Sequence, residues 1–361
     1  MILSEPQHWR AAAVNLFDVL RRGHLADTTP QPATVIDQGP QRVVSRFEPN
    51  LDAPTGRHDT AVLLVPPLAA PALCFDLRRG CSVAQFLVDQ GYPTYLVDYG
   101  EIAFGDRNLG VEHWIRDVLP QAVAAVHADH GGNVHLVGWC LGGLFALLST
   151  ADNPELPVAS ISAVASPLDM SLIPLVAPLR PLAQLTVGRI VSALYRTLGS
   201  APAPIVAKMF QLSGFDKYVT RPIAVLNNIT DGDFLAQIEA VDLFMGQMLA
   251  YPGRTFGQLY HRFFRANALA QGTFDIDGRQ IDLAAVQVPV LSVAGLGDGI
   301  APKPSVHAIA EFLPQATLRD APGGHLGVLT GRAARDTTWR IVDEFLSATE
   351  ASTARPANRI G

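Results

Sequence analysis

The segment that most restricts how this chain can fold is residues 134–148, VHLVGWCLGGLFALL. Its first part is a short apolar run typical of a buried strand, and its last part has a helical pattern. Between them lies Gly-x-Cys-x-Gly, centred on Cys140. A strand that turns sharply into a helix strains its central residue, and side chains two positions to either side would clash. The pattern therefore predicts an exposed nucleophile at Cys140, the alternative being a buried structural cysteine beside a tight turn.

Short, β-rich apolar runs recur along the chain, and helix-like segments separate the early ones. Two of these segments, 81–91 and 111–131, have helical periodicity; Gly91 is expected to end the first, and Pro120 to kink or break the second. Unbroken apolar strands are typical of parallel sheets that are buried on both faces. The predicted architecture is thus a mostly parallel, doubly wound α/β sheet, with strands at 61–65, 94–98, 134–138, 159–166 and 289–295.

The regular alternation stops in the middle of the chain, where Pro, Leu and aromatic residues are frequent. We expect residues 167–269 to form a helical cap insertion over the active site, the alternative being helical packing at the sheet edge. The core is then predicted at 60–166 and 270–346, after an N-terminal segment 1–59 with a helix near residues 8–22 and a lead-in strand. The small, polar tail 347–361 is expected to be disordered or a linker.

Composition excludes several classes of protein. Of the 361 residues 48% are hydrophobic and 17% are charged, so a large core is available. The net charge is −6 and there is no basic stripe, which argues against nucleic acid as a partner. Three cysteines, without a paired metal-binding spacing, favour a reducing compartment and predict neither disulfides nor a metal.

Targeting signals are not expected either. The N-terminus lacks the basic start and apolar run of a secretory signal. The longest apolar stretch, 61–75, contains three prolines and is shorter than the roughly 20 residues that span a bilayer. We therefore expect a cytoplasmic protein.

A cysteine nucleophile of this kind needs a base and an acid, which follow it in chain order on loops after later strands. Asp298 lies in a Gly-rich turn just after the predicted strand 289–295, and His325 lies among glycines after another short strand. These loops lie at the carboxyl ends of the strands, where ligands bind in such sheets. Asp231 and Asp233 are competing acids, but they fall in the insertion and are expected to cap a helix.

The oxyanion of an acyl intermediate needs N–H donors. The N–H of Leu141, directly after the nucleophile, is the first candidate by position. The second should come from the loop after strand 61–65, which reads PPLAAP. Proline has no N–H, so Leu68 or Ala69 must supply it.

Several ordered blocks together resemble the polyhydroxyalkanoate synthases, over residues from about 60 to 347. They are LLVPPLAAPALCFDLRRG, the box around Cys140, SPLDM at 166–170, FRANALAQGTFDIDGRQIDLAAVQVPVLSVAGLGDGIAP, and the Gly-His pair at 324–325. The resemblance implies an α/β-hydrolase fold and the catalytic roles for Cys140, Asp298 and His325. The chain lacks the long N-terminal region of the larger synthases, and LAAPALCFDL replaces the family's usual Asn-Lys-aromatic run after Val-Pro-Pro.

The resemblance implies an acyltransferase that forms an acyl-thioester on Cys140 from 3-hydroxyacyl-CoA and passes it to a hydroxyl, without a cofactor. A lipase, esterase or acyl-CoA thioesterase with the same three residues is the first alternative. A non-catalytic synthase-like subunit is the second. The short length is similar to that of synthases that work with a separate subunit, so a homodimer, a partner subunit or a lipid or polymer granule surface are the expected partners.

Overall fold

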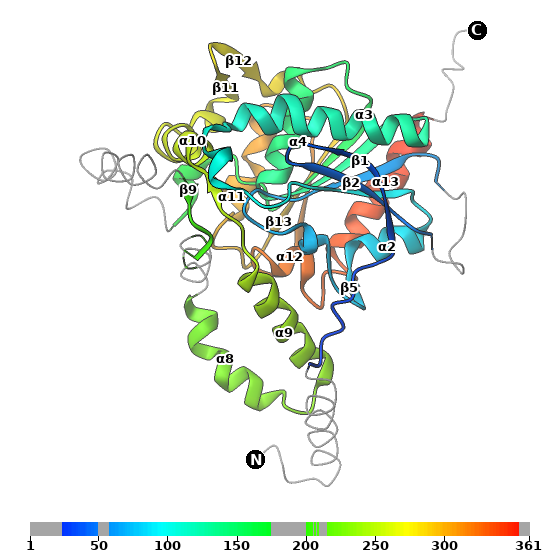
Figure 1. The fold of residues 1–361 in the computed structure, drawn as a ribbon, viewed down its shortest axis with the longest axis vertical. Coiled ribbons are helices and arrows are strands. Elements are labelled where there is room, and N and C mark those ends of the chain that lie inside the picture. The colour runs from blue at the N-terminus through cyan, green and yellow to red at the C-terminus, as the bar shows by residue number, and fades with distance from the viewer. Residues whose placement is uncertain are drawn as a thin grey trace.

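The computed structural model describes residues 24–49, 58–174, 200–204, 206, 208 and 215–353. Its centre is an eight-stranded sheet in the order β1-β2-β6-β3-β7-β8-β13-β14 (Figure 1). From β6 to β14 all neighbouring strands are parallel, whereas β2 runs antiparallel to both β6 and β1. The predicted mostly parallel α/β sheet is therefore confirmed.

The strands of this sheet are β1 (Ala33–Gly39), β2 (Arg42–Phe47), β3 (Ala61–Val65), β6 (Thr94–Asp98), β7 (Val134–Trp139), β8 (Val158–Val164), β13 (Val290–Gly295) and β14 (Thr317–Ala321). Short two-stranded ribbons are formed by β4 (Asp76–Arg78) with β5 (Cys81–Ser82), β9 (Ser200–Ala201) with β10 (Tyr251–Pro252), and β11 (Thr273–Ile276) with β12 (Arg279–Asp282). The α-helices are α2 (Val83–Gln90), α3 (Leu119–His130), α4 (Leu141–Asp152), α8 (Phe215–Asn227), α9 (Gly232–Gly246), α10 (Gly253–Gln258), α11 (Lys303–His307), α12 (Gly327–Thr330) and α13 (Thr338–Thr353).

The central strands are apolar throughout because helices cover both faces of the sheet. In β3 the side chains of Leu63 and Val65 belong to one buried cluster, with α3 and α4, and those of Val62 and Leu64 belong to the other, with α2 and α13. Successive side chains of a strand point to opposite faces, so a strand covered on both sides needs apolar residues at every position. This is why the sequence has unbroken apolar runs rather than alternating ones.

The two predicted helices before the nucleophile are present. In α2, Ser82 caps the first turn through the N–H of Gln85, and Gly91 ends the helix at a φ of 96°. The segment 111–131 also stays helical, as a π-helical turn at His113–Val118 followed by α3. The irregularity thus precedes Pro120, which lies in the first turn of α3, where a missing N–H is tolerated. The expected break at Pro120 is therefore replaced by a change of helix type one residue before it.

The described part of the predicted cap region is mostly helical, apart from the short ribbon of β9 and β10. Helices α8 and α9 lie to one side of the sheet, at the lower end of Figure 1, and α10 continues into a π-helical turn at Leu259–Arg265. Asp231 caps α9 through the N–H of Phe234, as predicted. The two ends of the region meet where Asn267 donates to Asp169 at 2.8 Å and accepts from the N–H of Met170. Residues 175–199 of the region lie outside the described part, and the boundaries 167 and 269 stay a prediction.

The expected disorder from residue 347 is wrong for 347–353. These residues complete α13, because the buried side chains of Trp339, Val342 and Leu346 dock the helix on the core. Glu350 then extends the attachment, since its Oε2 lies 2.6 Å from Nδ1 of His58 and its Oε1 accepts the N–H of Thr60. Other polar residues of the segment also face the core, since the hydroxyl of Ser347 lies 2.9 Å from that of Tyr92 and Thr349 is buried. The predicted N-terminal helix at 8–22 and residues 354–361 lie outside the described part.

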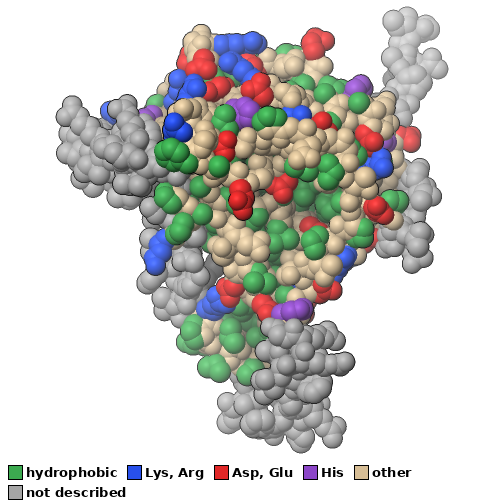
Figure 2. Space-filling model, in the orientation of Figure 1, with side chains coloured by type: hydrophobic (Ala, Val, Ile, Leu, Met, Phe, Trp, Pro, Cys, Tyr) green, Lys and Arg blue, Asp and Glu red, His purple; other side chains and the backbone are tan. Residues whose placement is uncertain are grey.

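Two further findings concern the described residues as a set. None of their helices combines the length and hydropathy needed to cross a membrane. No group of three or more of their His, Cys, Asp or Glu side chains is arranged to hold a metal ion. On the face drawn in Figure 2, acidic and basic side chains are interspersed.

Candidate active site

The backbone at Cys140 has the strained turn that the sequence pattern predicts. Cys140 has φ 54° and ψ −120°, directly after β7 and before the first residue of α4. Its N–H is held by the carbonyl of Val164 at 2.9 Å. A positive φ is unfavourable for a residue with a side chain and persists only where surrounding structure enforces it. The result is a half-buried thiol at the carboxyl end of the central strand.

The flanking glycines are required by close approach of the backbone. A Cβ on Gly138 would collide with the backbone of Gly142 and Gly143. A Cβ on Gly142 would collide with the carbonyl oxygen of Val65, at the end of β3. Gly138 therefore lets the strand and the following helix approach each other within the turn, and Gly142 lets the turn pack against the end of β3.

Asp298 and His325 meet at the same edge of the sheet. Oδ2 of Asp298 lies 2.8 Å from Nδ1 of His325, and both side chains are almost completely buried. Asp298 follows β13 and His325 follows β14, two adjacent parallel strands. The loops are joined further by the N–H of Gly297, which donates to the carbonyl of Gly323 at 2.8 Å. The structure thus brings together the two residues that the sequence placed on separate loops.

The electrostatics of His325 connect it to Cys140. Burial lowers the pKa of His325, but the negative charge of the Cys140 sulfur and the bond to Asp298 outweigh it and raise the pKa to about 10. Nδ1 is used by Asp298, while the buried Nε2 has no conventional hydrogen-bond partner among the described residues, which leaves it for the Cys140 sulfur whose interaction raises the pKa. The nitrogen that remains free is the one that could exchange a proton with the sulfur.

The candidate oxyanion donors follow the carboxyl ends of two paired strands, Leu141 after β7 and Leu68 and Ala69 after β3. Leu141 is the first residue of α4, so its N–H has no acceptor within the helix. Ala69 has a φ of 65°, and its carbonyl accepts the N–H of Leu249 at 2.8 Å. Within the described part of the chain, the N–H groups of Leu68 and Ala69 have no backbone acceptor. All three N–H groups are thus free to donate, and the carbonyl of Ala69 is held by the segment after α9.

The competing acids take other partners. Asp231 accepts hydrogen bonds from Arg332 and from the N–H of Phe234, and Asp233 forms ion pairs with Arg78 and Arg332. His135 lies fully buried in β7, with Nδ1 2.7 Å from the hydroxyl of Ser160. Neither arrangement involves Cys140.

Three hydrogen bonds that support the site were not predicted from the sequence. Oδ1 of Asp298 accepts the N–H groups of Ile300 and Ala301 at 2.8 Å each, which fixes the carboxylate. The indole Nε1 of Trp139 donates to the carbonyl of His325 at 3.1 Å, and their rings lie 5.2 Å apart. The backbone contacts leave no mark in a sequence. Trp139, by contrast, is a large aromatic beside the nucleophile, and its position was a usable signal.

Comparison with known proteins agrees with this geometry. The family model described as the alpha/beta hydrolase fold matches residues 61–332, which is more than half of the chain. Among solved structures, an esterase from Thermogutta terrifontis superposes with a TM-score of 0.50 at 15% identity, covering 89% of this chain and 100% of that one. A putative non-heme bromoperoxidase from Mycobacterium tuberculosis superposes with a TM-score of 0.51 at 16% identity, covering 88% of this chain and 97% of that one. At such identities the likeness concerns the fold alone.

Similarity in sequence points to a smaller group of proteins than similarity in structure does. The poly(3-hydroxyalkanoate) polymerase subunit PhaC of Haloferax mediterranei is 24% identical over 81% of this chain, which spans only 59% of that protein. The PhaC subunit of Allochromatium vinosum is 24% identical over 86% of this chain and 87% of its own length. The resemblance to polyhydroxyalkanoate synthases is therefore confirmed, and the chain belongs to the alpha/beta hydrolase fold family.

Proposed function

We propose that this chain is an acyltransferase of polyhydroxyalkanoate synthase type, with Cys140 as nucleophile, His325 as general base and Asp298 as the residue that orients His325. The observation that carries the proposal is a cysteine at the strained turn that interacts with a histidine whose Nδ1 is held by Asp298 and whose Nε2 has no other partner among the described residues. The relatives named as polymerase subunits support the reaction type.

The first half of the reaction loads the enzyme. Nε2 of His325 accepts the proton of the Cys140 thiol, and the sulfur attacks the thioester carbonyl of a 3-hydroxyacyl-CoA. The carbonyl oxygen becomes an oxyanion, which the N–H of Leu141 and that of Leu68 or Ala69 stabilise by about 3 kcal/mol each. The bond to the CoA sulfur then breaks, and CoA leaves with the proton from His325.

The second half transfers the acyl group. His325 accepts the proton of an incoming hydroxyl, whose oxygen attacks the acyl-cysteine. The bond to Cys140 breaks, an ester forms, and the sulfur regains the proton. Because a thioester is exchanged for a thioester in the first half, the acyl group stays activated for this step. No cofactor is needed, and CoA enters only as part of the substrate.

Intact-mass analysis after exposure to 3-hydroxybutyryl-CoA tests this proposal. The expected result is one acyl group on the wild-type chain, none on Cys140→Ala, and an unchanged signal on Cys74→Ala, which removes a different buried thiol. CoA release with formation of polymer supports the transferase. Release of free acid from both 3-hydroxybutyryl-CoA and p-nitrophenyl acyl esters would reject it in favour of a hydrolase.

The partners follow from the same proposal. The relatives are named as subunits, so a second chain, identical or different, is proposed as a partner, and the polymer granule as the place of work. Exposed Ile223 and Leu226 on α8 and Leu243 on α9 offer apolar side chains for such a contact. Light scattering on the purified chain measures its oligomeric state, and cosedimentation with native granules tests binding to the polymer granule.

A further inference from the structure

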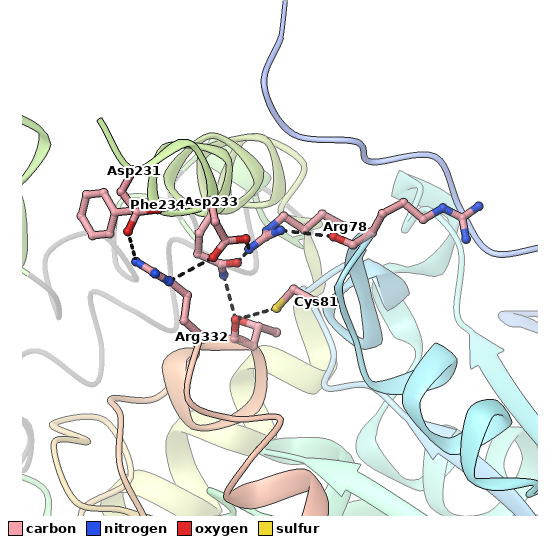
Figure 3. A network of polar contacts seen from close by, with 9 residues as sticks. Arg78, Cys81, Asp231, Asp233, Phe234 and Arg332 are labelled. Carbon is pink, nitrogen blue, oxygen red and sulfur yellow. Dashed lines mark hydrogen bonds and ion pairs between the residues drawn. The ribbon is translucent and has the colours of Figure 1, made fainter. Parts of the chain in front are cut away.

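Helix α9 of the cap region is joined to the core at its first turns by a network of polar contacts, drawn in Figure 3. Arg78, whose side chain is 8% exposed, bonds Asp233 at 2.7 Å and the amide oxygen of Gln237 at 2.8 Å. Arg332 pairs with both Asp231 and Asp233. A nearly buried arginine that contacts two side chains of one helix fixes the position of that helix on the core, because leaving the buried charge unpaired is costly.

The same network reaches the segment that follows His325. Nε2 of Gln237 donates to the carbonyl of Thr330 at 2.8 Å, and the thiol of Cys81 donates to the same oxygen at 3.0 Å. Burial raises the pKa of Cys81 to about 11, which keeps this thiol a donor. Thr330 ends α12, a short helix that begins two residues after His325 and whose last N–H returns to Leu326. Gln237 thus holds a rigid turn directly attached to the histidine.

The last turns of α9 contact His325 by a second route. Phe244 is 1% exposed, and its ring lies 6.5 Å from that of Trp139. Trp139 in turn packs its ring on the imidazole and donates its indole N–H to the carbonyl of His325. The helix therefore spans from the residue before the nucleophile to the turn after the histidine.

We propose that Gln237 and Trp139 are positioning residues, through which helix α9 holds the imidazole of His325 in line with Cys140. The inference rests on the proposed function and adds a role for α9: the position of this helix on the core sets the geometry of proton transfer between His325 and Cys140. The requirement is strict, because a displacement of about 1 Å can cost roughly 100-fold in rate. Departure of α9 would loosen His325 from both sides at once.

The experiment uses the full chain and changes each route separately. Trp139→Phe keeps a ring and removes the indole donor. Gln237→Glu keeps an acceptor for Arg78 and removes the donor to Thr330. The matched control is Arg221→Gln, which breaks the ion pair between Arg221 on α8 and Asp242 on α9, a pair that is not among the contacts joining α9 to the segment after His325.

Two measurements are made on each variant: kcat and KM for CoA release, and the titration of the His325 imidazole by NMR. We expect both variants to lower kcat about tenfold with KM nearly unchanged. The pKa of His325 should fall, because its partners Asp298 and the Cys140 sulfur then lie less well placed. The control should match the wild type in both.

Three results would overturn the inference: unchanged kcat and pKa in both variants, a rise in KM alone, or an equal change in Arg221→Gln. Thermal unfolding identifies a variant that is only less stable, and the second variant then decides. If the wild type releases no CoA, the proposed function fails, whereas a shifted His325 titration in both variants still supports the positioning role.

Discussion

Both carboxylate oxygens of Asp298 are hydrogen-bonded, but only one of them contacts His325. Oδ2 lies 2.8 Å from Nδ1 of the imidazole, while Oδ1 accepts two backbone N–H groups. The carboxylate therefore cannot rotate without losing two hydrogen bonds. This rigidity fixes which ring nitrogen of His325 remains free, and from it the first prediction follows.

Asp298→Asn is expected to lower CoA release by roughly 10³-fold, because an amide donor at Nδ1 favours the wrong imidazole tautomer. The measurement is steady-state CoA release followed by chromatography. Asp320→Asn, which breaks an ion pair with Lys303, is the control and should keep full activity. Activity of Asp298→Asn within tenfold of the wild type would contradict the proposed role.

Removal of the sulfur should change the titration of His325. The pKa of His325 is about 10 because the negative charge of Cys140 and the bond to Asp298 outweigh the effect of burial. Cys140→Ala removes the first of these and leaves burial unchanged, so the pKa must fall, and the imidazole should be less protonated at pH 8. Side-chain NMR of labelled histidine measures this, and an unchanged or higher value would show that the sulfur does not interact with His325.

His135 should make the protein less stable in acid. Burial lowers its pKa to about 4 in the folded state, whereas the unfolded value is near 6.5. Between these values the unfolded chain binds the extra proton, so the free energy of unfolding falls as pH drops from 6.5 to 4, by roughly 2–3 kcal/mol.

Chemical denaturation at several pH values tests this prediction. His135→Gln is expected to have a smaller loss of stability over that range, because glutamine does not titrate. His127→Gln, at an exposed position of α3, should behave as the wild type. Equal pH slopes for His135→Gln and wild type would be inconsistent with a neutral buried imidazole.

Gly142→Ala should destabilise the chain by about 1–3 kcal/mol and reduce activity, because the added methyl meets the carbonyl oxygens of Val65 and Pro66 and must push β3 and the turn apart. Gly105→Ala, where a Cβ meets nothing within 4 Å, is the control. Thermal unfolding and CoA release are measured on both. A Gly142→Ala chain that is as stable and active as the control would mean that the turn can relax without cost.

The sequence by itself determined the local features. Apolar runs specify the strands because a sheet covered on both faces admits no polar position, and the pattern around Cys140 specifies the strained turn because only glycine fits beside it. The helix end at Gly91 was readable for the same reason, because it is decided by residues within one turn. Chain order and glycine-rich loops then pointed to Asp298 and His325.

Only the tertiary structure decided which side chains meet. In the folded chain Asp231 pairs with Arg332 and Asp233 with Arg78, whereas Asp298 pairs with His325. The contact of Glu350 with His58 likewise extends α13 to Thr353. The tertiary structure also placed Trp139 on the imidazole and Gln237 on the turn behind it. These contacts join residues that are far apart in the chain, so they depend on how the strands and helices pack and not on any local pattern.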